Sequence, residues 1–266
     1  MAGEVLSLHR YPVKSMLGED LAALDLDTHG VVGDRALALT DPDTGRVATA
    51  KQPRHWRRLL TCTSAGVGDD VRVTLPDGRT VDAGQAAGPL AELLGRPVVV
   101  ARQRADGAVV ERPDPEDVLA HGLDADVDAP TLEIAQGTPG GRFVDHSPVH
   151  LITTATLDAL GVEALRYRPN VVVATPPGTE PFVENGWLGR RLTLGEVVLV
   201  PTLPTPRCSV PTLEHGDLPR APHALRGPAD RNRVEVDGFG VLPCAGLYAR
   251  VERTGTLRLG DPLDVT

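Results

Sequence analysis

Cys208 stands in a stiff part of the sequence where a thiol could do chemistry. It directly follows Arg207, and prolines occupy positions 204, 206 and 211. Proline fixes its own φ angle, lacks a backbone N–H and restricts the residue before it, which disfavours a regular helix or a central strand. We therefore expect a stiff loop after a strand at residues 196–200. The adjacent guanidinium favours the thiolate, which attacks electrophiles and binds soft metals.

The other two cysteines lack such surroundings. A single free cysteine is most often a small buried hydrophobe, and we assign that role to Cys62 and Cys244, which have no adjacent cation. The three cysteines form no CxxC pair, no even disulfide set and no run for an iron–sulfur cluster. A zinc site at His146 and His150 is disfavoured because Pro148 lies between them.

Cationic and hydroxyl residues recur far from Cys208 in the sequence. Arginine offers a planar fork of donors that matches phosphate, and the first turn of a helix offers free N–H groups. A lysine in a turn is normally a solvated charge, so each position is a weak signal when taken alone. The candidates for binding an anionic group are Lys14, Ser15, Arg35, Thr153, Thr154, Arg168 and Asn170.

The composition limits the class of protein. A formal charge of −9 disfavours general binding to nucleic acids or anionic membranes, although a small basic pocket remains compatible with it. No segment approaches ~20 continuous apolar residues, and charged residues interrupt the N-terminus, so we expect neither a membrane span nor a signal peptide. We expect a cytoplasmic, reducing setting.

The pattern of short apolar runs and turns predicts a mainly β protein with a few helices. We expect strands at residues 4–9, 21–26, 35–40, 46–50, 59–64, 71–75 and 98–101, with one helix at 88–94. An acidic excursion at 105–127 precedes further strands at 149–154, 171–174, 196–200, 246–252 and 256–259, and a helix at 157–165. Because βαβ alternation is missing, barrels are favoured over a doubly wound sheet.

These motifs together resemble the MOSC superfamily, and within it the members with an N-terminal β-barrel domain, such as the mitochondrial amidoxime-reducing components. The resemblance implies an N-terminal domain at residues 1–104 and a MOSC domain at 105–266, with the first ~35 residues packed on the C-terminal barrel. The matching motifs run from Tyr11 to Gly260-Asp261-Pro262. One departure is Leu213-Glu214-His215-Gly216, where relatives carry an Asp-Pro-Asp-Thr-Gly-like loop. We expect residues 213–233 to lie at the mouth of the site.

The resemblance also implies a function. Cys208 would be the catalytic residue and the protein ligand of molybdenum in a pterin cofactor. Groups around the cofactor would include Arg207, Tyr248 and the seven candidates for anion binding, with Glu184 and Trp187 supporting the wall. The implied enzyme is a molybdenum-dependent reductase of small N-hydroxylated compounds, with electrons from a separate reductase or an iron–sulfur or haem protein. The alternative is a cofactor carrier or sulfur-transfer protein with a Cys208 persulfide.

Overall fold

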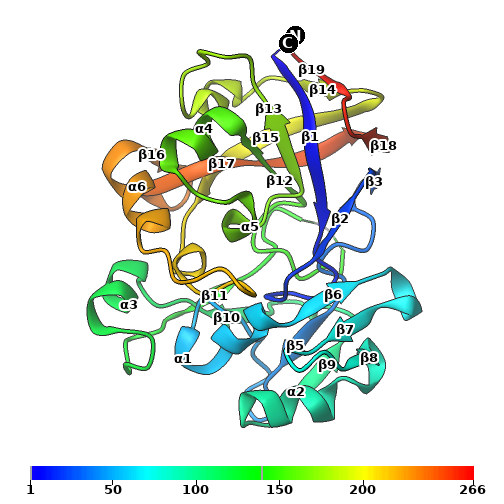
Figure 1. Cartoon of the computed structure of the whole chain (residues 1–266), viewed down its shortest axis with the longest axis vertical. Helices are drawn as coiled ribbons and strands as arrows, with labels where there is room; N and C mark the ends of the chain where they lie inside the picture. Colours follow the sequence, from blue (N-terminus) through cyan, green and yellow to red (C-terminus); the bar gives the residue numbers. More distant parts are fainter. Residues whose placement is uncertain (1, 139) are drawn as a thin grey trace.

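A closed β-barrel forms the larger part of the chain. The computed structural model describes residues 2–138 and 140–266. Seven strands close the barrel, because β12 pairs with both β13 and β17 at the two ends of the strand order. In order around the barrel these are β12 (Val149–Thr153), β13 (Val171–Ala174), β1 (Gly3–Arg10), β19 (Pro262–Val265), β14 (Leu192–Leu194), β15 (Val197–Pro206) and β17 (Gly240–Arg253). The mainly β fold class predicted from the sequence is therefore confirmed (Figure 1).

The first strand of the chain belongs to this C-terminal barrel. β1 is antiparallel to β13 on one side and to β19 on the other, and Ala2 N–H donates to the Leu263 carbonyl. The two chain ends consequently lie side by side (Figure 1). The residues after β1, including Tyr11 and Lys14, are carried to one end of the barrel, where the N-terminal unit begins.

Inward-facing aliphatic side chains fill the barrel. Val5, Leu151, Val171, Leu199 and Leu247 come from five different strands and are at most 2% exposed. β12 and β13 read as nearly continuous apolar runs because helices cover their outer faces. These helices are α4 (Thr154–Leu160), α5 (Ala164–Tyr167) and α6 (His223–Arg231).

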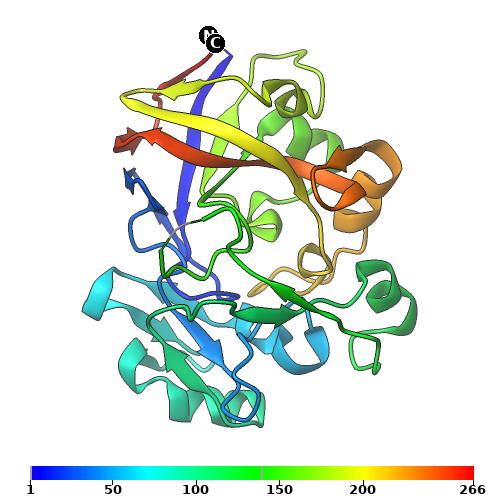
Figure 2. The same ribbon diagram turned by 180° about the vertical axis from the view of Figure 1, so that it is seen from behind.

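β15 continues through three prolines where the sequence predicted a loop. Val198 and Leu199, near its start, pair with both β14 and β17, whereas the later part pairs only with β17. The pairing shifts register around Pro201 and between Pro204 and Pro206. Proline is tolerated at such bulges and on a strand with one free edge, because no ladder hydrogen bond is lost there. The loop predicted after residue 200 is thus wrong, and Cys208 follows the end of a long strand (Figure 2).

The smaller N-terminal unit packs small sheets around Trp56. β5 (Ala38–Thr40) pairs with β9 (Val99–Ala101), and β6 (Thr63–Ala65), β7 (Arg72–Thr74) and β8 (Thr80–Asp82) form a second sheet. Helices α1 (Pro53–Trp56) and α2 (Ala87–Leu94) cover one side, and their core includes Leu39, Leu59 and Leu90. The strand predicted at 59–64 is wrong in its first half, where Arg57–Thr61 forms a 3₁₀ helix. The segment predicted as a strand at 46–50 forms only an isolated bridge at Val47.

The acidic segment between the two units is more ordered than the sequence indicated. β10 (Val109–Glu111) and β11 (Thr131–Glu133) form a hairpin-like pair around α3 (Pro115–His121). Asp114 caps α3 by accepting a hydrogen bond from the Glu116 N–H. The remaining strands are β2 (Glu19–Leu21), β3 (Ala23–Asp27), β4 (Gly30–Val31), β16 (Arg233–Val236) and β18 (Gly255–Arg258), and further 3₁₀ helices span Gly68–Asp70, Ala83–Gln85, Val183–Trp187 and Val210–Thr212.

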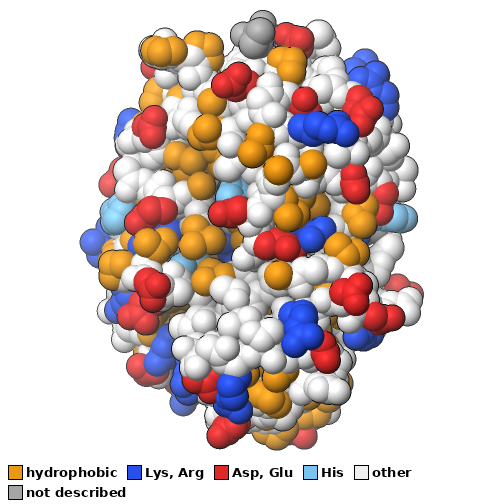
Figure 3. All heavy atoms as spheres, turned by 45° about the vertical axis from the view of Figure 1, so that its right-hand side comes forward, with side chains coloured by type: hydrophobic (Ala, Val, Ile, Leu, Met, Phe, Trp, Pro, Cys, Tyr) orange, Lys and Arg blue, Asp and Glu red, His pale blue; other side chains and the backbone are white. Residues whose placement is uncertain are grey.

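The surface agrees with the acidic composition. Figure 3 shows acidic, basic and hydrophobic side chains interspersed over one face, without a continuous basic field. In the described part of the chain, no helix combines the length and hydropathy needed to cross a bilayer.

A buried carboxyl group ties the start of α4 to the 3₁₀ helix at Val183–Trp187. Glu184 Oε2 accepts hydrogen bonds from the hydroxyls of Thr153 at 2.9 Å and Thr156 at 2.8 Å, and Glu184 is fully buried. Burial raises the pKa of Glu184 above its ordinary value of 4.5, because the charged form is poorly solvated. The folded protein therefore holds this proton more tightly than the unfolded chain does.

The E184Q variant should become more stable relative to the wild type as the pH rises. Above about pH 4.5 the unfolded chain releases the Glu184 proton and the folded chain retains it, so the wild type loses stability with rising pH. Gln keeps an acceptor for both threonines without a charge. Denaturant unfolding at pH 5 and pH 8 should show the E184Q–wild-type difference growing with pH, and E184A should be less stable by about 1–3 kcal/mol. A difference independent of pH would contradict this account.

Candidate functional site

A basic cavity lies where the barrel meets the N-terminal unit. It encloses about 740 Å³ of space, part of which is open to solvent. Eight of the residues singled out in the sequence line it together: Lys14, Ser15, Arg35, Arg168, Asn170, Arg207, Cys208 and Tyr248. These residues come from both ends of the chain because β1 is one of the strands of the C-terminal barrel.

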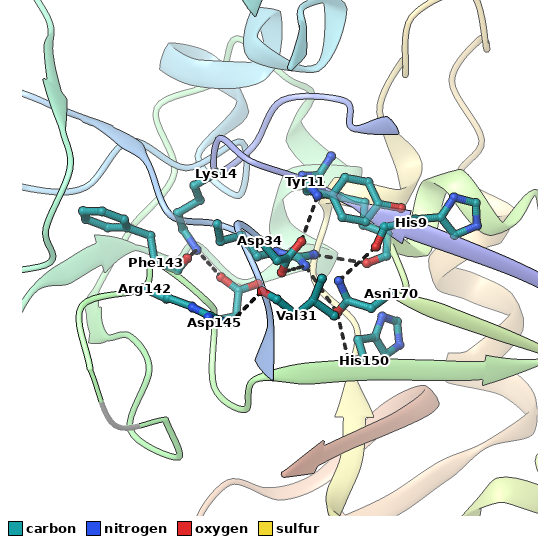
Figure 4. Close-up of polar contacts among 12 residues, drawn as sticks. His9, Tyr11, Lys14, Val31, Asp34, Arg142, Phe143, Asp145, His150 and Asn170 are labelled. Atoms are coloured by element: carbon teal, nitrogen blue, oxygen red, sulfur yellow. Dashed lines mark hydrogen bonds and ion pairs between the residues drawn. The ribbon is translucent and has the colours of Figure 1, made fainter. Parts of the chain in front are cut away.

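The carboxylate of Asp145 forms ion pairs with both lysines of the chain. Lys14 Nζ lies 2.6 Å from Asp145 Oδ1 and also donates to the Phe143 carbonyl at 2.9 Å (Figure 4). Lys51 Nζ lies 3.0 Å from Asp145 Oδ2. Both lysine side chains are nearly buried, whereas the carboxylate is partly exposed to the cavity. This wall of the cavity thus contains two positive charges and one negative charge.

The pKa values of both Lys14 and Asp145 are lowered in this cluster. Burial lowers the pKa of Lys14 to about 8, and Lys51 adds to the lowering, although Asp145 opposes it. Lys14 and Lys51 hold the pKa of Asp145 well below its usual range, against the effect of burial. Asp145 therefore stays ionised at neutral pH, and Lys14 is the group of the pair that titrates near pH 8.

Arg168 is a buried cation with unused donors. Its side chain is 9% exposed, and neither Nη1 nor Nη2 has a hydrogen-bond partner within residues 2–138 and 140–266. Its guanidinium lies over the Tyr11 ring, 4.4 Å from the centroid. Burial lowers the pKa of Arg168 to about 10, and Arg35 adds to that lowering. Unpaired buried N–H groups of a cation cost free energy unless an anion accepts their hydrogen bonds. These groups of Arg168 therefore favour binding of an anionic group in the cavity.

The buried carboxylate of Asp34 holds the guanidinium of Arg35 in place. Its Nη1 lies 2.5 Å from Asp34 Oδ2, and its Nη2 donates to the Arg168 carbonyl at 3.1 Å. The other Asp34 oxygen accepts the Tyr11 N–H (Figure 4). Asp34 therefore fixes both the guanidinium of Arg35 and the backbone that leads to Lys14.

The backbone is strained at this cavity. Among the described non-glycine residues five have a positive φ, and three of these line the cavity: Ser15 at 65°, Arg35 at 45° and Arg168 at 55°. Such conformations cost of order 1–3 kcal/mol each and persist where the surroundings impose them, most often at functional sites. At Ser15, for example, the Oγ accepts the Ala50 N–H and so joins the segment to the loop before Lys51.

Asn170 and Arg207 use their polar groups within the protein. Asn170 Oδ1 accepts the His150 N–H, and its Nδ2 donates to the His9 carbonyl, so Asn170 links three barrel strands. Arg207 donates to the carbonyls of Thr205 and Tyr167 and to His150 Nε2. Burial and the Arg207 charge consequently hold the pKa of His150 well below its usual value, and the ring stays neutral. Both residues shape the cavity wall.

Cys208 differs from the other cysteines in its accessibility. It is half-buried and lines the cavity, whereas Cys62 and Cys244 are fully buried, and burial raises the pKa of each of those thiols to about 11. A buried thiol of high pKa is inert at neutral pH. Within the described chain, Cys208 is the cysteine that a ligand in the cavity can reach.

Thr153 and Thr154 do not line the cavity. The Thr153 hydroxyl caps α4 and donates to Glu184, and the Thr154 hydroxyl is bound to Thr175. Glu184 belongs to that cluster as well and does not line the cavity. The segment 213–233, expected at the mouth, does not line the basic cavity, because it packs beside α5, where Arg166 binds the carbonyls of Leu213 and Pro219.

The sequence analysis missed Lys51 and Asp145. A signal was present for Lys51, since Lys14 and Lys51 are the only lysines among 27 basic residues. In a chain that otherwise uses arginine, two lysines at one carboxylate mark a place where a compact charge is required. No comparable signal marks Asp145, one of 36 acidic residues.

Comparisons with known proteins agree with this architecture. Residues 2–106 match the MOSC N-terminal beta barrel domain, and residues 140–264 match the MOSC domain. The chain therefore belongs to the MOSC family, which is associated with binding of the molybdenum cofactor.

The curated relatives are distant. Mitochondrial amidoxime-reducing component 1 of Mus musculus is 23% identical, over 98% of this chain and 82% of that protein. Mitochondrial amidoxime reducing component 2 of Rattus norvegicus is 31% identical over 46% of this chain, and this match spans 37% of the rat protein. The crystal structure of YUAD protein from Bacillus subtilis aligns with a TM-score of 0.44 and 13% identity, over 100% of this chain and 96% of that one.

Replacement of Arg168 by Met should separate folding from anion binding. Met keeps most of the side-chain volume and the same positive-φ backbone, but it removes the unpaired charge. We expect the ligand-free R168M protein to be at least as stable as the wild type in thermal unfolding. Binding of phosphate, measured by calorimetry, should weaken by about 1.5–3 kcal/mol. A large loss of stability with unchanged phosphate binding would show that Arg168 is structural.

Anion binding should also fall as Lys14 loses its proton. Because the pKa of Lys14 is lowered to about 8, phosphate affinity should decrease between pH 7 and pH 9. The unfolded chain keeps this lysine charged up to about pH 10.5, so the ligand-free protein should gain stability over the same range. A K14R variant should show a flatter pH profile of phosphate affinity, since arginine stays charged. Equal profiles for both proteins would contradict the role of Lys14.

Proposed function

We propose that this protein is a molybdenum-dependent reductase of small N-hydroxylated compounds. The observation that carries the proposal is the convergence of Cys208, Arg168 and the Lys14–Asp145–Lys51 cluster on one cavity. The donor set fits the cofactor, because it combines one accessible thiol with cations that carry more charge than their carboxylate partners. The names of the amidoxime-reducing relatives support the reaction class.

The chain's own residues would bind and orient the cofactor. Arg168 would donate both free Nη groups to an anionic group, and its burial would strengthen that contact because water screens it little. Lys14 and Lys51, held by Asp145, would supply compact positive charge in the same cavity. Cys208 would bind the metal through its thiolate, as a soft ligand. When bound, the cofactor supplies a metal centre that can remove oxygen from an N–OH group with two electrons and two protons.

Further properties of the proposal concern partners and location. We place the reaction in the cytoplasm, where a reducing setting suits three free cysteines. The two electrons would come from a separate reductase or from an iron–sulfur or haem protein. The alternative, a carrier or sulfur-transfer protein with a persulfide on Cys208, uses the same cavity without turnover of N-hydroxylated compounds.

Substitution of Cys208 by Ser tests the proposal directly. An alcohol is a poor replacement for a soft thiolate, so C208S should lose N-hydroxy reduction by a factor of at least ~10³ with an artificial electron donor. C62S and C244S are the matched controls, and their turnover should stay close to the wild type if they fold. The protein should come from a host that makes the cofactor, and its molybdenum content should be measured in parallel.

The outcomes separate the two functions. Wild-type protein that carries molybdenum and reduces amidoximes supports the reductase. Protein that carries molybdenum without reducing any N-hydroxylated compound supports the carrier. Full activity of C208S would exclude Cys208 as the metal ligand.

A further inference from the structure

Ser7, His9 and Asp20 form a row of hydrogen-bonded side chains that does not line the basic cavity. Ser7 Oγ lies 2.8 Å from His9 Nε2, and His9 Nδ1 lies 2.6 Å from Asp20 Oδ1. Figure 4 shows the His9 ring on the far side of Tyr11 from Lys14. A serine, a histidine and a carboxylate in this order are the groups with which proteins activate a serine hydroxyl.

A bulge in β1 places Ser7 and His9 on the same outer face of the barrel. The ladder with β13 shifts register between Val5 and Ser7, so Leu6 is an extra residue in β1. Val5 and Leu8 both belong to the barrel core, although strict alternation would place residues three apart on opposite faces. After the bulge the alternation resumes at Leu8, and the residues on either side of it, Ser7 and His9, face outward.

The backbone of His9 is fixed on both sides. Its N–H donates to the Asn170 carbonyl at 2.9 Å, and its carbonyl accepts from Asn170 Nδ2 at 3.3 Å. On the other edge of β1, His9 is the register partner of Asp20 in β2. A side chain on a strand paired on both edges is held more precisely than one on a loop. The His9 ring is therefore well placed to act repeatedly on the same neighbour.

The carboxylate of Asp20 determines the tautomer of the neutral His9 ring. An ionised carboxylate can only accept, so Nδ1 carries the ring proton and Nε2 is left as an acceptor. The hydroxyl of Ser7 consequently donates its proton to Nε2. This is the direction of proton transfer that a histidine needs to act as general base on a serine.

Ser7 is also the serine that a reagent in solution can reach. The chain has five serines, and the other four are buried: Ser15, Ser64, Ser147 and Ser209. Ser7 is partly exposed, and the side chain of Leu6 next to it is 53% exposed. His9 is 13% and Asp20 89% exposed, so water screens the outer contact of the row. A nucleophile in such an open position suits small, unhindered reactants, and Leu6 offers apolar surface to them.

We propose that Ser7 is an activated nucleophile that takes the acyl group of small esters, with His9 as its general base. Ser7 Oγ bonds to the ester carbonyl carbon and passes its proton to His9 Nε2. The ester C–O bond breaks, and His9 returns the proton to the leaving alcohol. Water, deprotonated by His9, then releases the carboxylic acid and restores the Ser7 hydroxyl. This activity is separate from the proposed reductase and needs neither the basic cavity nor its cofactor.

The first test labels the unmodified protein with a fluorophosphonate, a reagent for activated serines. Mass spectrometry of peptides should locate the label at Ser7, and S7A should remain unlabelled. The four buried serines are internal controls in the same molecule. Label on one of those serines in place of Ser7, or no label at all, would overturn the proposal.

The second test measures how fast p-nitrophenyl acetate acetylates Ser7, again from the masses of peptides. Acetylation of amines gives little background, because both lysines are nearly buried in ion pairs with Asp145. H9Q should slow acetylation of Ser7 by about 10²-fold, as expected for loss of a general base. D20N should slow it by about two- to fivefold, because the lost contact is exposed.

The matched control is H121Q, which removes an exposed histidine of α3 that binds the Asp117 carbonyl. Its rate of Ser7 acetylation should equal that of the wild type. Folded H9Q that acetylates as fast as the wild type would exclude His9 as the base. D20N changes an exposed side chain and keeps the fold intact, so it tests the row even where H9Q is unstable. A D20N rate equal to the wild type would exclude the role of the carboxylate.

Discussion

Asp145 forms ion pairs with two lysines at once, and the arrangement of the whole site depends on this shared carboxylate. Lys14 follows β1, Lys51 lies in the loop before α1, and Asp145 precedes β12, so one carboxylate joins three distant segments. Because it can balance only one of the two charges, a positive charge remains in a nearly buried wall.

The excess positive charge makes this cavity of an acidic protein suited to an anion. The chain carries a formal charge of −9, yet Arg168 is buried with two unused donor groups and Arg207 has only carbonyl and imidazole partners. The surrounding structure holds Ser15, Arg35 and Arg168 at strained φ angles, so these segments are fixed. Rigid, incompletely paired cations are costly in the free protein, and they favour a bound anion for the same reason.

The sequence predicted the mainly β class and eight residues of the cavity, because the motifs of the family include them. It missed Asp145, which has no local signature. It did not indicate that the hydroxyls of Thr153 and Thr154 bind Glu184 and Thr175. It also ended β15 too early, since the prolines that exclude a central strand are tolerated where β15 keeps a single partner. Such contacts between distant segments cannot be deduced from local patterns.

The most direct measurement is a crystal structure of protein from a cofactor-making host, with anomalous data collected on both sides of the molybdenum absorption edge. The account predicts an anomalous peak within bonding distance of Cys208 Sγ, with the anionic part of the cofactor against Arg168 and Lys14. Molybdenum-containing protein whose peak lies away from Cys208, or whose basic cavity holds no part of the cofactor, would contradict the account.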